Sequence, residues 1–175
     1  AAVEYNLPIN FHIGASDQTM DWWGNQPWPS QTGERRMAIS SALLSLCNTR
    51  ILSNILTCGV LDRFPALKFV SVESGIGWIP FLLESLEYQY SQYFTKSESF
   101  LRLSPWEYFQ RNIYSTFWFE RADFANVVKR VGVDNVMFET DFPHPSCIYP
   151  NGPEFLSAEL AKLDVESRRK IMSGN

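Results

Sequence analysis

The chain has 175 residues, the size of one domain, with 45% hydrophobic residues and a formal net charge of −4. This composition excludes a disordered chain, because the apolar residues suffice for a core. The acidic balance and the lack of a basic run argue against a nucleic-acid partner, and no apolar run reaches the roughly 18 residues that span a membrane. Cys47, Cys58 and Cys147 have no metal-type spacing, so we interpret them as reduced thiols of a cytoplasmic protein.

The first predicted strand covers residues 7–13 and leads into a loop that is rich in tryptophan. His12 lies close to the end of this strand. Residues 20–33, which include Trp22 and Trp23, fit neither a helical nor a strand period. Such a loop can form the wall or lid of a pocket, or its tryptophans can cover the core, and the sequence leaves both interpretations open.

Helical spacing begins after this loop, and Asn48 is predicted to be the N-cap of a second helix. Gly59 is predicted to end that helix, and a short turn to Pro65 follows it. The sequence from Ser104 to Glu107 has the pattern of a capping box, and Asp164 is predicted to cap the last helix.

Strand, loop and helix alternate four times along the chain. This order indicates an α/β fold in which parallel strands are joined by helical crossovers. The predicted strands cover residues 7–13, 67–72, 112–117 and 136–140, and the predicted helices cover residues 32–46, 48–59, 79–94, 104–110, 121–131, 154–163 and 166–172.

Polar or titratable side chains stand at the carboxyl ends of all four predicted strands. They are His12, Glu73, Thr116 and Asp141. Enzymes with parallel sheets place their functional groups at these ends. We therefore expect the four side chains to belong to one active site.

Four strand–helix units are half of an eight-unit barrel. A curved sheet of four strands has two open edges, which must be covered or paired. The chain begins at Ala1 and ends directly after a helical pattern, so we expect a fragment that needs either missing residues or a partner.

Asp141 is the strongest candidate for chemistry. A carboxylate at a strand end can bind a divalent metal and take a proton from water, or it can cap the loop through backbone N–H groups. His12 can bind zinc or a similar metal through its imidazole, or it can be a core histidine with satisfied hydrogen bonds.

Three further side chains are candidates for substrate binding or for orienting the ligands. His144 follows Asp141 by three residues and can hold substrate, shuttle a proton or orient Asp141, or be an ordinary loop histidine. Glu73 can ligate metal, bind a cationic group, or cap the following helix. Trp118 can line a pocket or pack in the core.

Four segments carry a family resemblance: residues 10–14 (NFHIG), 59–70 (GVLDRFPALKFV), 73–80 (ESGIGWIP) and 139–145 (ETDFPHP). They resemble the amidohydrolase-2 family. This is the branch of the metal-dependent amidohydrolase superfamily that includes aminocarboxymuconate-semialdehyde decarboxylase and related aromatic-acid decarboxylases. The resemblance covers nearly the whole chain, because residues 168–175 are also similar to the helix that closes these proteins.

The resemblance implies a (β/α)8 TIM barrel, of which this chain covers strands five to eight as one domain, residues 1–175. It implies His12 as a metal ligand on the fifth strand, and Asp141 as a ligand and proton acceptor on the eighth. The family's first-strand motif, His-x-His or Asp-x-His, is absent. Glu73 stands where the decarboxylases carry a sixth-strand histidine.

We therefore expect a metal-dependent hydrolase or decarboxylase, the latter a lyase, that acts on a small carboxylated or cyclic substrate. The expected cofactor is a divalent metal, zinc first and manganese second. Trp22, Trp23, Trp118, Glu73 and His144 are expected around the substrate or behind the ligands. The alternative is a catalytically silent half-barrel without metal, which assembles through its open edges with a second copy or with a missing amino-terminal half.

Overall fold

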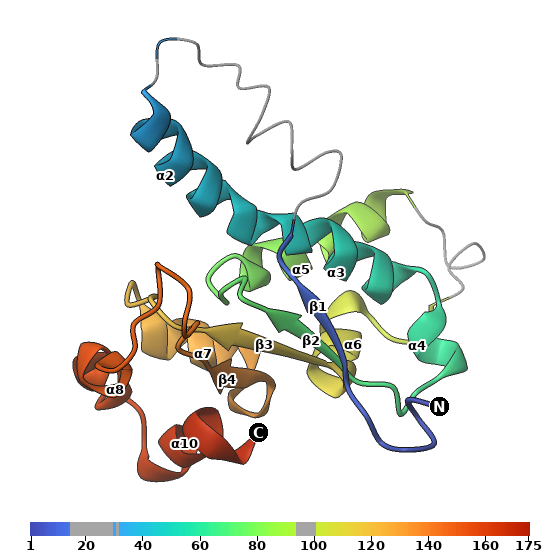
Figure 1. Ribbon diagram of the computed structural model, residues 1–175. Coiled ribbons are helices and arrows are strands. Elements are labelled where there is room, and N and C mark those ends of the chain that lie inside the picture. Colours follow the sequence, from blue (N-terminus) through green and yellow to red (C-terminus); the bar gives the residue numbers. More distant parts are fainter. Residues whose placement is uncertain (15–29, 31, 94–100) are drawn as a thin grey trace.

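The computed structural model describes residues 1–14, 30, 32–93 and 101–175. Its centre is a sheet of four parallel strands in the order β1-β2-β3-β4, as Figure 1 shows. His12 pairs with Val72, and Phe117 pairs with Phe138, so the strands end at one common rim. The α/β prediction with a parallel four-stranded sheet is confirmed. The strands are β1 (Ile9–His12), β2 (Phe69–Val72), β3 (Ile113–Phe117) and β4 (Val136–Phe138).

Helices connect the strands, and in the described residues none of them is long and apolar enough to cross a membrane. A short helix, α4, replaces the turn that was expected between Gly59 and Pro65. The helices are α2 (Gly33–Leu44), α3 (Asn48–Thr57), α4 (Val60–Arg63), α5 (Ile79–Tyr93), α6 (Pro105–Asn112), α7 (Phe124–Val131), α8 (Gly152–Phe155), α9 (Ser157–Leu160) and α10 (Val165–Arg169). There are also 3-10 turns at η1 (Ser45–Cys47) and η2 (Val133–Asn135) and a π-helical turn at η3 (Lys170–Gly174).

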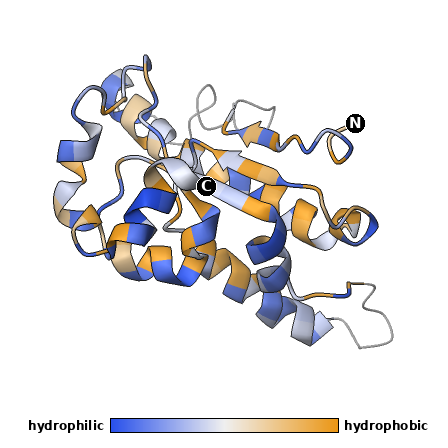
Figure 2. Ribbon diagram, turned by 90° about the horizontal axis from the view of Figure 1, so that it is seen from below, coloured by the Kyte–Doolittle hydropathy of each residue, from blue (hydrophilic) through white to orange (hydrophobic). Residues whose placement is uncertain are grey.

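The hydrophobic core lies between one face of the sheet and the helices that cover it. Phe69, Ile113, Phe117 and Val136 alternate along β2, β3 and β4 and belong to this core. The helices contribute buried residues such as Leu52, Leu83, Phe109 and Val128. Figure 2 shows the hydrophobic and hydrophilic residues that alternate along these helices. The core fixes the strands, and the strands fix the rim on which polar groups gather.

The strand β1 differs from its neighbours because it lies at an edge of the sheet. Ile9, Asn10 and His12 are exposed, and only Phe11 is half-buried and packs against the core. The apolar residues within 7–13 predict a buried strand, and this prediction is wrong for β1. An edge strand has a partner on one side alone, so its outer backbone groups and side chains face solvent.

Asn48 has a different role from the predicted one. It is the first residue of α3, its side chain makes no cap, and it is fully buried. Its Nδ2 donates to the Ser71 hydroxyl at 3.1 Å, and also to the backbone oxygens of Phe11 and Val72 at 3.4 Å. The predicted N-cap was wrong because these bonds to β1 and β2 are formed with residues far away in the sequence. Asn48 ties the edge strand to the sheet and to α3.

Replacing Asn48 with alanine should lower the free energy of unfolding by about 1–3 kcal/mol, because the buried groups that it bonds would lose their donor. Urea denaturation measures this loss. Asn54→Ala on the exposed side of the same helix is the control and should change the free energy by less than about 0.5 kcal/mol. Equal effects of the two substitutions would contradict the role given to Asn48.

Candidate metal centre

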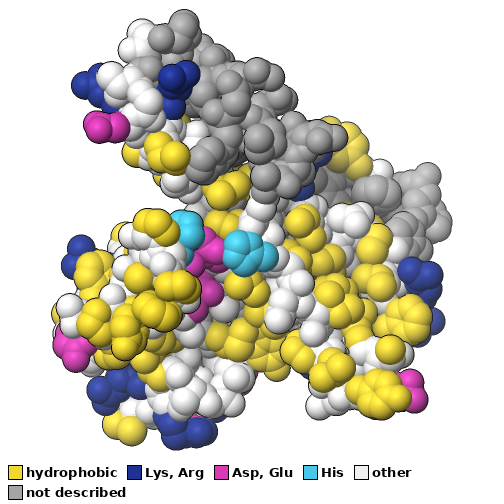
Figure 3. All heavy atoms as spheres, in the orientation of Figure 1, with side chains coloured by type: hydrophobic (Ala, Val, Ile, Leu, Met, Phe, Trp, Pro, Cys, Tyr) yellow, Lys and Arg dark blue, Asp and Glu magenta, His cyan; other side chains and the backbone are white. Residues whose placement is uncertain are grey.

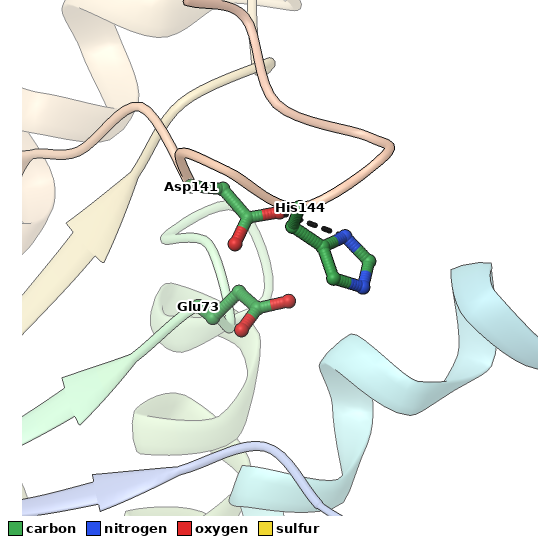
Figure 4. A group of neighbouring side chains, drawn as sticks. All are labelled: Glu73, Asp141 and His144. Carbon is green, nitrogen blue, oxygen red and sulfur yellow. Dashed lines mark ion pairs between the residues drawn. The ribbon is translucent and has the colours of Figure 1, made fainter.

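Three side chains from two strand ends point toward one another, as Figure 4 shows. Glu73 follows β2, whereas Asp141 and His144 lie in the loop after β4. One ligand atom from each lies within 4.8 Å of the other two. Figure 3 shows the two histidines beside acidic side chains in a hollow on this face of the molecule. The rim of the sheet therefore brings two carboxylates and an imidazole together.

The backbone is bent sharply at both carboxylates. Glu73 and Asp141 have φ angles of 58° and 61°, in the left-handed region that few residues other than glycine adopt. The loop after Asp141 is closed by a hydrogen bond of 2.8 Å from the N–H of His144 to the Asp141 carbonyl oxygen. These bends turn both side chains away from the direction of their strands and toward the shared space.

The Asp141 carboxylate is 11% exposed and is held on one side. Its Oδ2 accepts a hydrogen bond from the Ser146 hydroxyl at 3.1 Å and lies 3.2 Å from His144 Nδ1. The same hydroxyl lies 2.7 Å from His144 Nδ1. In Figure 4 the other oxygen of Asp141 is turned toward Glu73. Ser146, which the sequence analysis did not single out, thus fixes the orientation of both predicted site residues.

His12 and Thr116 both contact Glu73 and so belong to the same group of residues. The His12 imidazole is 62% exposed, and its Nε2 contacts the Glu73 carboxylate. The backbone N–H of Glu73 donates to the Thr116 hydroxyl at 2.9 Å. All four predicted strand-end residues therefore lie at the rim, although His12 contacts Glu73 rather than Asp141.

Glu139 is a site residue that the sequence analysis took for part of a buried strand. Burial raises the pKa of its carboxyl to about 7, and the neighbouring charges of Glu73 and Asp141 add to this effect. Contacts with Thr116 and with the backbone of Glu73 act in the opposite direction. One oxygen, Oε1, is buried without a hydrogen-bond partner. The available signal was a charged residue directly after the apolar strand β4, at the same strand end as Asp141.

Replacing Glu139 with glutamine should raise the melting temperature of the metal-free protein at pH 8 but not at pH 4.5. The pKa in the folded state lies above the ordinary 4.5. Ionisation therefore costs folding free energy, and this cost is absent below pH 4.5 and grows as the pH rises through 7. Thermal melts with a chelator across this range test the prediction. A gain in melting temperature that is the same at both pH values would contradict it.

A cavity of about 650 Å³ opens beside these residues. Glu73 and His144 line it together with Trp118, which is buried, and Phe119, which is half exposed. Its volume is in the range of small-molecule pockets. Trp118 is thus both buried and part of the cavity lining, whereas the predictions for Trp22 and Trp23 concern residues outside the described part of the chain.

The donor set suits a divalent cation. Carboxylate oxygens and imidazole nitrogens are ligands of both zinc and manganese. In the described part of the chain, Glu73 and Asp141 form ion pairs with histidines and with no Lys or Arg side chain. Clustered carboxylates repel one another unless a cation or a proton neutralises them. Burial is the main cause of the raised pKa of Glu139, and the same surplus of negative charge adds to it.

The fold and the rim define a class: an α/β protein of parallel strand–helix units with a carboxylate–histidine site at the strand ends. A family model described as amidohydrolase matches residues 1–175. The chain therefore belongs to the amidohydrolase-2 family, and the resemblance read from its motifs is confirmed. Curated proteins gave no significant match.

Several solved structures share the fold of this chain. An amidohydrolase from Mycobacterium avium subsp. paratuberculosis K-10 has a TM-score of 0.74 and 23% identity, over 98% of this chain and 41% of that one. A 5-carboxyvanillate decarboxylase from Sphingomonas paucimobilis has a TM-score of 0.67 and 22% identity, over 98% of this chain and 48% of that one. A dihydroxybenzoic acid decarboxylase from Polaromonas sp. JS666 was solved with manganese and the inhibitor 2-nitroresorcinol. It has a TM-score of 0.65 and 17% identity, over 97% of this chain and 48% of that one. The chain spans less than half the length of these three proteins.

Proposed function

We propose that this chain is the carboxyl-terminal half, strands five to eight, of a metal-dependent hydrolase or decarboxylase. The observation that carries the proposal is the convergence of Glu73, Asp141 and His144 beside a cavity of small-molecule size. The substrate is a small carboxylated or cyclic molecule. Decarboxylases among the structural neighbours, several of them solved with manganese, support this class.

Asp141 and His12 are the proposed metal ligands, and Glu73 and His144 complete the donor set. A divalent cation, zinc or manganese, would supply Lewis-acid polarisation of the substrate at this place. Because Ser146 and His144 hold Oδ2 of Asp141, Oδ1 is the atom that moves a proton. In hydrolysis it takes the proton of an attacking water and passes it to the leaving group. In decarboxylation it first takes a proton from water and then delivers it to carbon after carbon dioxide has left.

The aromatic wall of the cavity orients the substrate. Trp118 and Phe119 form a perpendicular pair with ring centroids 4.8 Å apart, and both face the cavity. Such a wall binds a flat ring by its faces and edges and excludes water from the reacting group. The carboxylate of such a substrate needs a cation to offset the negative rim, which again favours a metal in the site.

Metal analysis and a substrate screen test this function together. The purified chain is stripped with chelator and then reloaded with zinc or manganese, and wild type is compared with His12→Ala. We expect one metal ion per chain and turnover in a panel of hydrolase and decarboxylase substrates, with both reduced in the variant. A chain that binds no metal and turns over none of the panel supports the silent half-barrel instead.

The open edge of β1 favours assembly with another polypeptide. Leu7 and Ile9 are exposed along this edge, and Val3 and Tyr5 are exposed just before it. We propose that the chain self-associates through its sheet edges when no other barrel half is present, because such edges otherwise attract unspecific pairing.

Sedimentation velocity at several concentrations measures this association. The expected result is a species of twice the chain mass or more, which dissociates when Ile9 is replaced by lysine. A monomer at every concentration would contradict the proposed association and leave the metal site to be tested separately.

A further inference from the structure

The turn that carries Glu73 is built around a second carboxylate, that of Glu120. Glu120 follows β3 by three residues, in the loop that leads to α7. Its two oxygens accept hydrogen bonds from the N–H of Ile76, both at 3.0 Å, and Oε1 accepts a third from Gly77 at 2.7 Å. These donors belong to the turn between Glu73 and α5. A carboxylate from one loop thus holds the backbone of the neighbouring loop.

The glycines of this turn leave space for that carboxylate. A Cβ atom at Gly75 would lie 2.8 Å from Glu120 Oε2, and one at Gly77 would lie 3.1 Å from Oε1. Gly75 also has a φ angle of +71°, which glycine adopts without strain. The glycines in this segment therefore serve to admit the Glu120 side chain rather than a phosphate or another ligand.

Other contacts also fix this turn: Ile76 is buried in the core, and the N–H of Ile79 donates to the Ile76 carbonyl oxygen at 3.2 Å. The Ser74 hydroxyl lies 2.6 Å from the Ser71 hydroxyl, and Trp78 Nε1 donates to the Ser74 carbonyl oxygen at 2.7 Å. Glu120 holds its second half. Burial raises the pKa of Glu120, and the N–H groups of Gly77 and Ile76 oppose this effect. The carboxylate therefore has little solvent contact and is stabilised mainly by the backbone of the turn.

We infer that Glu120 is a positioning residue that sets the direction of Glu73 toward Asp141 and His144. The inference rests on the proposed metal site. Glu73 has a left-handed backbone conformation that is uncommon for its residue type, and a bent backbone keeps such a conformation only when its surroundings enforce it. Without the bonds to Glu120, the turn relaxes and the Glu73 carboxylate leaves its place. Trp118 and Phe119 lie in the same loop as Glu120, so one carboxylate also joins the cavity wall to the metal ligand.

Three variants test the inference. Glu120→Ala removes all acceptors, and Glu120→Gln keeps the shape and one acceptor oxygen. Glu107→Ala is the matched control, because Glu107 also accepts a backbone N–H, from Ser104 at 2.8 Å, in the capping box of α6. Binding of manganese is measured by isothermal titration, and hydrogen exchange reports on the amides of Ile76 and Gly77.

Glu120→Ala should weaken manganese binding by about 10- to 100-fold, as residues that orient metal ligands commonly do. Glu120→Gln should recover part of this loss, and Glu107→Ala should bind as wild type does even if it melts at a lower temperature. Exchange at Ile76 and Gly77 should accelerate in Glu120→Ala alone. Wild-type affinity in Glu120→Ala, or unchanged exchange at these amides, would overturn the inference. If the wild type binds no manganese, the metal site itself fails, and the exchange data still decide whether Glu120 holds the turn.

Discussion

Replacement of Asp141 by asparagine should reduce turnover by about 10²- to 10⁴-fold, the usual contribution of a group that transfers a proton. The amide keeps the shape of the side chain and can still accept from Ser146. It carries no negative charge and cannot take a proton at Oδ1. Steady-state kinetics with the best substrate of the screen measures the loss.

The control for this substitution is Asp134→Asn. Asp134 is an exposed residue that pairs with Lys170. It lies in η2, before β4, and therefore at the opposite end of that strand from Asp141. The Asp134→Asn substitution should leave turnover within about twofold of wild type, as expected of a surface substitution away from the site. An Asp141→Asn variant with wild-type turnover would remove Asp141 from the chemistry and with it the proposed mechanism.

Replacement of Phe124 by alanine should lower the free energy of unfolding by about 3–5 kcal/mol. Phe124 is 1% exposed in α7, and its ring lies 4.7 Å from that of Phe117, between centroids. Its removal leaves a cavity between α7 and β3. For a chain of this size the melting temperature should fall by roughly 6–20 °C.

Phe81→Ala is the matched control for this loss. Phe81 lies on α5 and is 77% exposed, so its removal leaves no cavity and should change the free energy of unfolding by less than about 0.5 kcal/mol. Calorimetry of both variants compares the two sites. Losses of similar size would mean that the core does not lie between the sheet and α7.

The features that the sequence predicted well are local. The capping box is present, since Ser104 accepts from the N–H of Glu107 at 3.3 Å and Glu107 accepts from that of Ser104. Asp164 caps α10 through a bond of 2.8 Å from the N–H of Ser167. Each depends on residues three positions apart, so a short stretch of sequence contains all the information. The parallel direction of the strands was predictable for a related reason, because alternating strands and helices indicate helical crossovers between parallel strands.

The features that the sequence left open depend on distant contacts. Asn48 looked like a cap, yet its partners in β1 and β2 lie 23 to 37 residues away. The partners of Glu120 lie 43 and 44 residues away, and no local pattern connects them. The position of His12 beside Glu73 depends in the same way on strand register. The sequence located the rim, but the pairing of side chains on it follows from the packing.

Anomalous diffraction from crystals of the chain grown with zinc is the most direct test of the proposed metal site. The account predicts one peak in the space between Glu73, Asp141 and His144, at about 2.0–2.2 Å from the carboxylate oxygens and the imidazole nitrogen. His12, a proposed ligand that contacts Glu73, is expected to move to the same ion. The absence of a peak at this rim, or a zinc ion bound elsewhere with the rim empty, would contradict the account.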